Sequence, residues 1–227
     1  MHLAPLWTDK KLYIWIYHTI PIIAKLQASG KRCLYFHSQA RLTERCGLEL
    51  NSVRYKVRAC KDQKKIDDFL RTSRVGHLGL SDGKHPYVVP LNYVWWNGKI
   101  YFHGAEGGRR NQIMKENAEV CFTVCAEYGT ITDPVPAKTD TAYMSVMLFG
   151  EAEPVTDLEE ATSMLQEMMD KYVPGYYNRP LAKQHVDKYR SAVYGSAVQV
   201  YSIEPQHLTA KESPMAEAKM YKPNSVY

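Results

Sequence analysis

Residues 74–104 read RVGHLGLSDGKHPYVVPLNYVWWNGKIYFHG and carry the clearest signals of secondary structure in the chain. It contains Asp-Gly at 82–83 and Asn-Gly at 97–98, between runs rich in valine, tyrosine and tryptophan. Such dipeptides between β-prone runs are the strongest short-range signal of a β-hairpin. We therefore predict three antiparallel strands, over residues 75–80, 86–96 and 99–103.

Pro90 lies inside the second of these strands. Proline has no backbone N–H to give to a ladder, so the strand should be bulged or at a sheet edge there. A kink at Pro90 would leave backbone groups of Val89, Leu91 and Asn92 unpaired. Such groups could form hydrogen bonds with the edge of a flat heterocycle.

The rest of the domain continues as strands with a few marginal helices. Alternating apolar residues predict three further strands, at 118–129, 142–155 and 196–211. Helical spacing predicts helices at 61–73, 109–117 and 157–173, and a shorter one within 176–191. Six mostly hairpin-linked strands indicate a mainly β protein whose antiparallel sheet closes into a small barrel.

The composition is that of an ordinary globular protein and argues against nucleic-acid binding. Of the 227 residues, 45% are hydrophobic and 23% are charged. Residues 1–51 hold seven Lys/Arg against three Asp/Glu, whereas residues 52–227 hold 22 against 21. A nucleic-acid-binding domain would carry a clear basic excess. The five cysteines form no CxxC pair, which argues against a disulfide framework or structural zinc and indicates the cytoplasm.

The first 51 residues do not share the pattern of the domain. The apolar run at 12–24 is too short to cross a bilayer, so no stable membrane insertion is expected. The run could be an interfacial or signal-like segment, a helix docked on the domain, or upstream sequence that the native protein lacks; we favour the last two. Residues 28–50 have the character of a linker. The domain is expected over residues 52–211, with a flexible tail over residues 212–227.

The segment GAEGGRR at 104–110 is a candidate anion site. Gly107 and Gly108 expose backbone N–H groups where a helix begins, and a helix N-terminus carries partial positive charge. Arg109 and Arg110 add guanidinium forks that match phosphate oxygens. The run lacks the Lys-Ser/Thr ending of a Walker A motif and the βαβ setting of a Rossmann fingerprint. From spacing alone, a phosphomonoester site and a plain loop with solvated arginines are equally open.

Two further sets of residues could carry chemistry. His103 ends the third strand and could contact a ligand or move a proton near neutral pH; the alternative is a surface histidine that caps the strand. Cys121 and Cys125 lie on one strand face and could hold a metal. Two buried thiols are the favoured interpretation, so no metal site is predicted.

Three motifs together resemble a known family. They are DGKHPYVVPLNY at 82–93, GKIYFH at 98–103 and SVMLFGEAEPV at 145–155. With them, residues 57–211 resemble the pyridoxamine 5'-phosphate oxidase-like FMN-binding split barrels, and within these the branch of the 5-nitroimidazole resistance (Nim) proteins. The resemblance implies a six-stranded antiparallel split β-barrel that forms a homodimer with FMN at the subunit interface.

The resemblance also implies site residues. The flavin-contacting strand falls on Val88, Val89, Pro90, Leu91 and Asn92. The strand-end histidine, which the family associates with the reaction site, falls on His103. The basic residue that holds phosphate is often lysine in this branch and is Arg110 here, with Gly107 and Gly108 beside it. Arg109 stands where a histidine is common, which leaves its role less defined.

Three functions follow from this set of residues. The first is an FMN-dependent oxidoreductase that reduces a nitroaromatic or similar small acceptor, with His103 as proton donor. The second is a non-catalytic module that binds flavin or haem. The third is a structural dimer with an empty site. Pyridoxamine phosphate oxidation itself is disfavoured, because the C-terminal part lacks the basic motif that would hold the substrate phosphate.

Overall fold

The computed structural model describes residues 52–190, 195 and 197–223. Contacts divide the chain into two units, Met1–Leu50 and Asn51–Tyr227, and the described residues belong to the second unit. The expected apolar run at 12–24 and linker at 28–50 lie outside the described residues. Within these residues, no helix is long and apolar enough to span a membrane.

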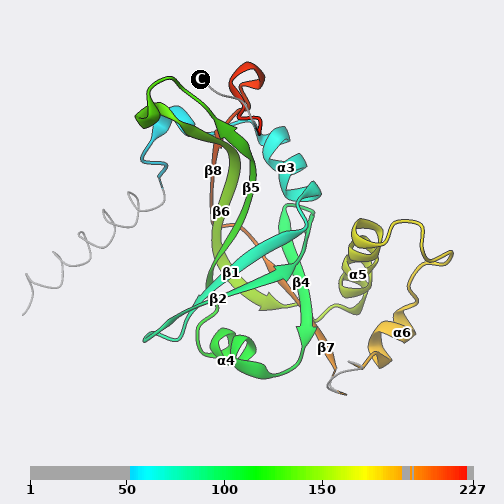
Figure 1. Cartoon of the computed structure of the whole chain (residues 1–227). Helices are drawn as coiled ribbons and strands as arrows, with labels where there is room; N and C mark the ends of the chain where they lie inside the picture. Colours follow the sequence, from blue (N-terminus) through cyan, green and yellow to red (C-terminus); the bar gives the residue numbers. More distant parts are fainter. Residues whose placement is uncertain (1–51, 191–194, 196, 224–227) are drawn as a thin grey trace, which may run out of the picture. The chain divides into compact units, whose positions relative to one another are not determined.

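All strand pairs in the described unit are antiparallel (Figure 1). The strands are β1 Val75–Ser81, β2 Pro86–Asn92, β3 Val94–Trp96, β4 Lys99–Ala105, β5 Glu119–Ile131, β6 Asp140–Pro154, β7 Val198–Ile203 and β8 His207–Ser213. Their order is β2-β1-β5-β6-β7-β4-β3, and β8 also pairs with β6. The long β6 therefore joins a first sheet, β2-β1-β5-β6-β8, to a second, β3-β4-β7-β6. This confirms the mainly β, split-barrel architecture.

The described residues form eight strands rather than the predicted six, because two of the predicted strands are divided. Residues 86–96 form β2 and β3, separated at Tyr93. The Tyr93 N–H donates to the hydroxyl of Tyr172, 3.0 Å away, and its carbonyl accepts from Lys171. The Tyr93 backbone therefore bonds to the end of a distant helix and not to a strand. Residues 196–211 divide into β7 and β8 at 204–206, where the Gln206 N–H donates to the Phe149 carbonyl at 2.9 Å.

Helices lie at the margins of the sheets (Figure 1). The α-helices are α3 Gln63–Thr72, α4 Gly108–Glu116, α5 Leu158–Tyr172 and α6 Lys183–Lys188, and the 3-10 turns are η1 Lys56–Arg58, η2 Pro136–Lys138 and η3 Glu217–Lys219. Side chains of Asp62 and Asp157 cap α3 and α5 by accepting backbone N–H groups, as their sequence positions predict.

Two clusters of buried side chains hold the unit together. The larger lies inside the barrel and includes Leu70, Phe102 and Phe122. The smaller includes Tyr101 and Met164 and joins the second sheet to α5. Neighbouring residues of β4 thus face opposite sides, Phe102 toward the barrel interior and Tyr101 toward α5.

Gly150 lies in the regular part of the β5–β6 pairing and does not mark a bulge. It pairs in register with Val120, and the register shift lies between Glu127 and Gly129. A Cβ at Gly150 would collide with the Glu204 carbonyl, so glycine is needed for a close backbone approach.

Part of the expected C-terminal tail is bonded to the sheet. Strand β8 runs through Ser213, which is buried. Beyond it, the Thr132 N–H donates to the Lys219 carbonyl and the Tyr221 N–H to the Thr130 carbonyl, both at 2.8 Å. Residues 219–221 are therefore held by hydrogen bonds to the end of β5 and the residue after it. The polar sequence of the tail does not reveal this long-range pairing.

Candidate functional site

The turn between β4 and α4 has the open backbone that its glycines predict. Gly107 is the N-cap of α4 with φ +125°, Gly108 has φ +80°, and no side chain caps the helix. These left-handed values favour glycine. A Cβ at either position would meet nothing within 4 Å, so the space beside the turn is free. The first N–H groups of α4 are thus available to an acceptor.

Arg110 lies across the end of β4, on the face that carries Phe102. Its guanidinium carbon is 5.5 Å from the centre of the Phe102 ring and 5.9 Å from that of Tyr201. A Cβ at Gly104 would collide with the guanidinium, so this approach requires glycine there. The Arg110 Nε donates to the Asn111 Oδ1 at 3.0 Å, which fixes the orientation of the fork.

Among the described residues, the charge of Arg110 has no local counter-ion. No carboxylate forms an ion pair with it among the described residues. Burial lowers the pKa of Arg110 from its ordinary value, yet a guanidinium remains protonated in proteins. A partly buried cation without an anion is unfavourable, and a bound phosphate would satisfy it.

Arg109 is differently engaged. It lies 3.7 Å from Asp82 in the β1–β2 turn, and its guanidinium carbon is 4.7 Å from the centre of the Tyr87 ring. The two adjacent arginines therefore have separate partners. Arg109 links α4 to the β1–β2 hairpin, whereas the outer donors of Arg110 have no hydrogen-bond partner among the described residues.

His103 lies on the opposite face of β4 from Arg110. Its Nδ1 is 3.0 Å from the sulfur of Met168 on α5. Although much of the residue is exposed, partial removal from water lowers the pKa of His103, and the charge of Arg110 lowers it further. The structure therefore brings Arg110 together with Gly107 and Gly108, and puts His103 on the other side of the strand.

The residues of the expected flavin-contacting strand alternate along β2. Val88, Pro90 and Asn92 are exposed, and Val89 and Leu91 are partly buried. Pro90 pairs in register with His77, so the predicted kink is absent. The other predicted explanation for Pro90, a position at a sheet edge, is correct, because β2 is an edge strand. Backbone groups are unpaired along its free edge, and not because of a local distortion.

The cysteines are less buried than predicted. Cys121 is partly buried and Cys125 is exposed, both as free thiols on the outer face of β5. The buried residues of this strand are Val120, Phe122 and Val124, as the alternation predicts. Within the described part of the chain, no group of three or more His, Cys, Asp or Glu side chains could hold a metal ion.

Sequence reasoning missed three residues that surround Arg110: Gly104, Asn111 and Tyr201. Asn111 is 2% exposed, and its amide donates to the Ala105 carbonyl at 2.8 Å. An asparagine directly after two arginines in a short helix was the available signal. The contact of Met168 with His103 had no signal in the sequence, because methionine in a helix is usually a core residue.

Solved structures share this fold. A flavocytochrome Anf3 from Azotobacter vinelandii has a TM-score of 0.59 at 24% identity, covering 74% of this chain and 77% of its own. A FAD- and haem-binding protein from Mycobacterium smegmatis has a TM-score of 0.57 at 18% identity, covering 73% and 76%. A putative 5-nitroimidazole resistance protein from Bacteroides thetaiotaomicron has a TM-score of 0.52 at 22% identity, covering 67% and 85%.

At these identities the structural likeness establishes the fold alone. Among curated proteins, none matches the chain in sequence. The sequence model of the family described as pyridoxamine 5'-phosphate oxidase matches residues 62–212, nearly the whole described unit. The chain therefore belongs to the pyridoxamine 5'-phosphate oxidase family of flavin-binding split barrels.

Proposed function

We propose that the protein binds FMN and holds the flavin phosphate at Arg110 and the first turn of α4. The observation that carries this proposal is the partly buried guanidinium of Arg110, which has no carboxylate partner in the described residues. The uncapped N–H groups after Gly107 and Gly108 lie at the same turn. Donors from a guanidinium and from a helix N-terminus within one turn suit a phosphomonoester.

The exposed side of β2 would contact the rest of the cofactor. Val88, Pro90 and Asn92 share this side, and the free edge of β2 offers backbone donors and acceptors. When bound, a flavin supplies the capacity to pass electrons one or two at a time. The residues of this chain would bind and orient it, and Arg109 would keep the β1–β2 hairpin against α4.

We further propose that the protein reduces a nitroaromatic or similar small acceptor, with His103 as the proton donor. Reduction of a nitro group consumes protons as well as electrons, and His103 is an exposed imidazole close to the end of β4. Support for this acceptor class comes from the solved 5-nitroimidazole resistance protein of the same fold. A reducing, cytoplasmic location fits the free thiols of Cys60, Cys121 and Cys125.

A homodimer is part of this proposal. The outer face of the first sheet is exposed and largely uncharged over its centre. Its residues include Val75, Val88, Pro90, Thr123, Met147 and Phe149, of which Val88 is 62% exposed. Exposed apolar patches of this kind are typical of protein interfaces. A second copy on this face would cover β2, and with it the proposed flavin contacts.

The test compares FMN with riboflavin, which lacks the phosphate. We expect the unmodified protein to purify with absorbance near ~370 and ~450 nm and to bind FMN more tightly than riboflavin. Arg110→Ala should weaken FMN binding by about 2–3 kcal/mol, or roughly 30- to 150-fold, and leave riboflavin binding little changed. Arg110→Lys should keep part of the difference in affinity between FMN and riboflavin.

Lys115→Ala is the matched control, because it removes an exposed positive charge from the last turn of the same helix. Equal binding of FMN and riboflavin, or an unchanged ratio in Arg110→Ala, would overturn the phosphate assignment. Tighter binding of FAD than FMN would replace FMN by FAD as the cofactor.

A second candidate function is haem binding. The observation that favours it is the exposed ring of His103, whose Nδ1 faces Met168 while no bond to its Nε2 is recorded among the described residues. Two proteins of the same fold are described as a flavocytochrome and as a haem-binding protein. A Soret band in the purified protein that disappears in His103→Ala would support this function, and its absence after haem is added would exclude it.

A further inference from the structure

A cleft separate from the Arg110 site lies between α3, the β3–β4 turn and α5. It has a volume of about 360 Å³ and is lined by Asp67, Arg71, Trp95, Trp96, Asn97 and Glu167, together with Gly98. Volumes of this size accommodate small organic ligands. None of these residues takes part in the proposed flavin site.

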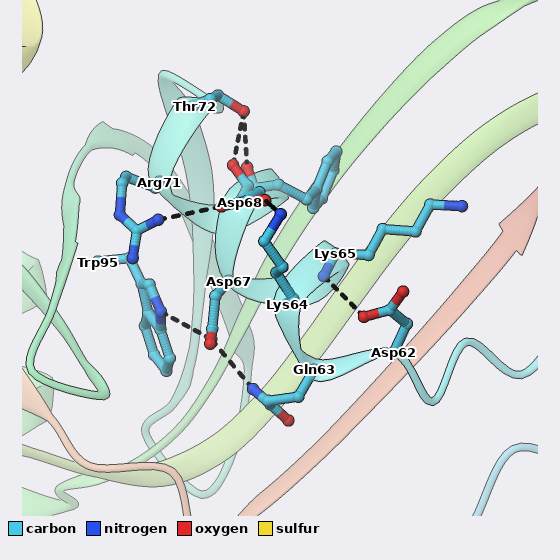
Figure 2. Close-up of polar contacts among 10 residues, drawn as sticks. Asp62, Gln63, Lys64, Lys65, Asp67, Asp68, Arg71, Thr72 and Trp95 are labelled. Carbon is cyan, nitrogen blue, oxygen red and sulfur yellow. Dashed lines mark hydrogen bonds and ion pairs between the residues drawn. The ribbon is translucent and has the colours of Figure 1, made fainter.

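One wall of the cleft is fixed before any ligand binds. The indole N–H of Trp95 donates to the Asp67 Oδ1 at 3.1 Å, and the Gln63 amide donates to the same oxygen at 3.0 Å (Figure 2). Both bonds use one carboxylate oxygen, and no hydrogen bond to the Asp67 Oδ2 is found in the described part of the chain. Asp67 is therefore oriented and still has an acceptor to offer.

A second aromatic wall is also held in place. The rings of Trp96 and Tyr101 meet edge to face, with centroids 5.7 Å apart and an angle of 60°. Trp95 packs against the barrel core, whereas Trp96 packs against the cluster under α5. The two indoles thus belong to different clusters, and each leaves part of its ring at the cleft.

The available charge of the cleft is negative. Arg71 also lines the cleft, and its charge is offset by Asp68 on the same helix, 3.1 Å away (Figure 2). Across the cleft, the Glu167 carboxylate forms no hydrogen bond or ion pair with any described residue. Asp67 and Glu167 therefore present carboxylates beside two indole rings. This is the chemistry that recognises an organic cation, through charge and through the faces of the rings.

We propose that this cleft is a binding site for a small organic ammonium ion. The ammonium group bonds to or faces the carboxylates of Asp67 and Glu167, and its alkyl groups cover Trp95 and Trp96. A neutral molecule of the same shape gains only the aromatic contact, and an anion meets two carboxylates. The site depends on charge and shape, and does not depend on whether a flavin is bound.

The test uses choline and its uncharged isostere 3,3-dimethyl-1-butanol on the full-length protein. Binding is followed by isothermal titration and by the indole N–H signals of Trp95 and Trp96 in NMR spectra. We expect saturable choline binding that shifts these signals, and binding of the isostere that is weaker by about tenfold or more. Glu167→Gln keeps the size of the side chain and should weaken choline binding several-fold.

Glu159→Gln on the same helix is the matched control, since Glu159 pairs with Lys183 away from the cleft and its loss should leave choline binding unchanged. Equal affinity for choline and the isostere would overturn the proposal. So would unchanged choline binding in Glu167→Gln, or the absence of saturable choline binding.

Discussion

His103 shows how one residue links the proposed chemistry to folding. Its imidazole is neutral in more of the folded population than in an unfolded chain, because partial removal from water and the charge of Arg110 lower its pKa. Proton binding is therefore weaker in the folded state. A proton donor of this kind becomes more available as the solution becomes more acidic.

This difference predicts a pH dependence of stability. Near pH 7.5 the side chain is mostly neutral in both states. As the pH falls through about 6.5, the unfolded chain takes up the proton first, so the free energy of unfolding should fall. In His103→Gln, which cannot titrate, the loss between pH 7.5 and 5.5 should be smaller. Denaturant unfolding of both proteins at both pH values tests this, and equal losses would show that His103 does not contribute.

The residues of the anion site could be predicted from sequence only as a group. GAEGGRR at 104–110 indicated exposed N–H groups and two guanidinium groups, and the structure has both. The sequence could not distinguish the role of Arg109 from that of Arg110. That distinction depends on Asp82 and Tyr87, which reach Arg109 from another hairpin. The collision that would follow from a side chain at Gly104 is likewise visible only in three dimensions.

At the scale of single elements, α5 supports the point where β2 and β3 separate. The Lys171 Nζ donates to the Tyr93 carbonyl at 3.0 Å and lies 4.2 Å from the centre of the Tyr93 ring. Burial lowers the pKa of Lys171 to about 8, with a further contribution from the charge of Arg74. No carboxylate pairs with Lys171 among the residues that the structure describes.

We expect Lys171 to be an unusually reactive amine. Near pH 8 about half of it is unprotonated, compared with under 1% of an ordinary lysine, so acetylation should favour it by roughly tenfold or more. Mass spectrometry after brief acetylation at pH 8 measures its labelling against the exposed Lys115. Arg74→Gln should reduce the labelling because it removes the neighbouring charge. Equal labelling of Lys171 and Lys115 would contradict this.

The same pKa gives a stability effect of known sign. Between pH 8 and 10.5 the unfolded chain binds more protons at Lys171 than the folded chain does. The free energy of unfolding therefore gains a contribution as the pH rises through this window. Below pH 8 the amine is protonated in both states and the full cost of its burial is present.

Strand boundaries were predictable where local signals decided them. The Asp-Gly and Asn-Gly dipeptides correctly gave the end of β1, the start of β2, the end of β3 and the start of β4 to within one residue. The break at Tyr93 could not be predicted, because its cause is Tyr172, 79 residues further along the chain. The apolar run through 86–96 continues across that break with no change in pattern.

At the scale of the whole molecule, the outer face of the first sheet should determine the oligomeric state. Met147 lies near its centre and is 37% exposed. Met147→Glu would place an unpaired charge in the proposed dimer interface and should weaken association by at least about tenfold. Analytical ultracentrifugation measures this, with Gln184→Glu on the exposed face of α6 as the control. A dimer unaffected by Met147→Glu would exclude this face.

The backbone amides of strand β6 provide an internal reference for hydrogen exchange in this protein. Residues 143–149 have β5 on one side and β8 on the other, and residues 152–154 continue into the second sheet with β7. Amides with neighbours on both sides can exchange with deuterated water only when the whole unit opens. The slowest-exchanging amides of β6 should therefore report the global free energy of unfolding. Measured against them, faster exchange near α4 would give the cost of opening the anion site alone.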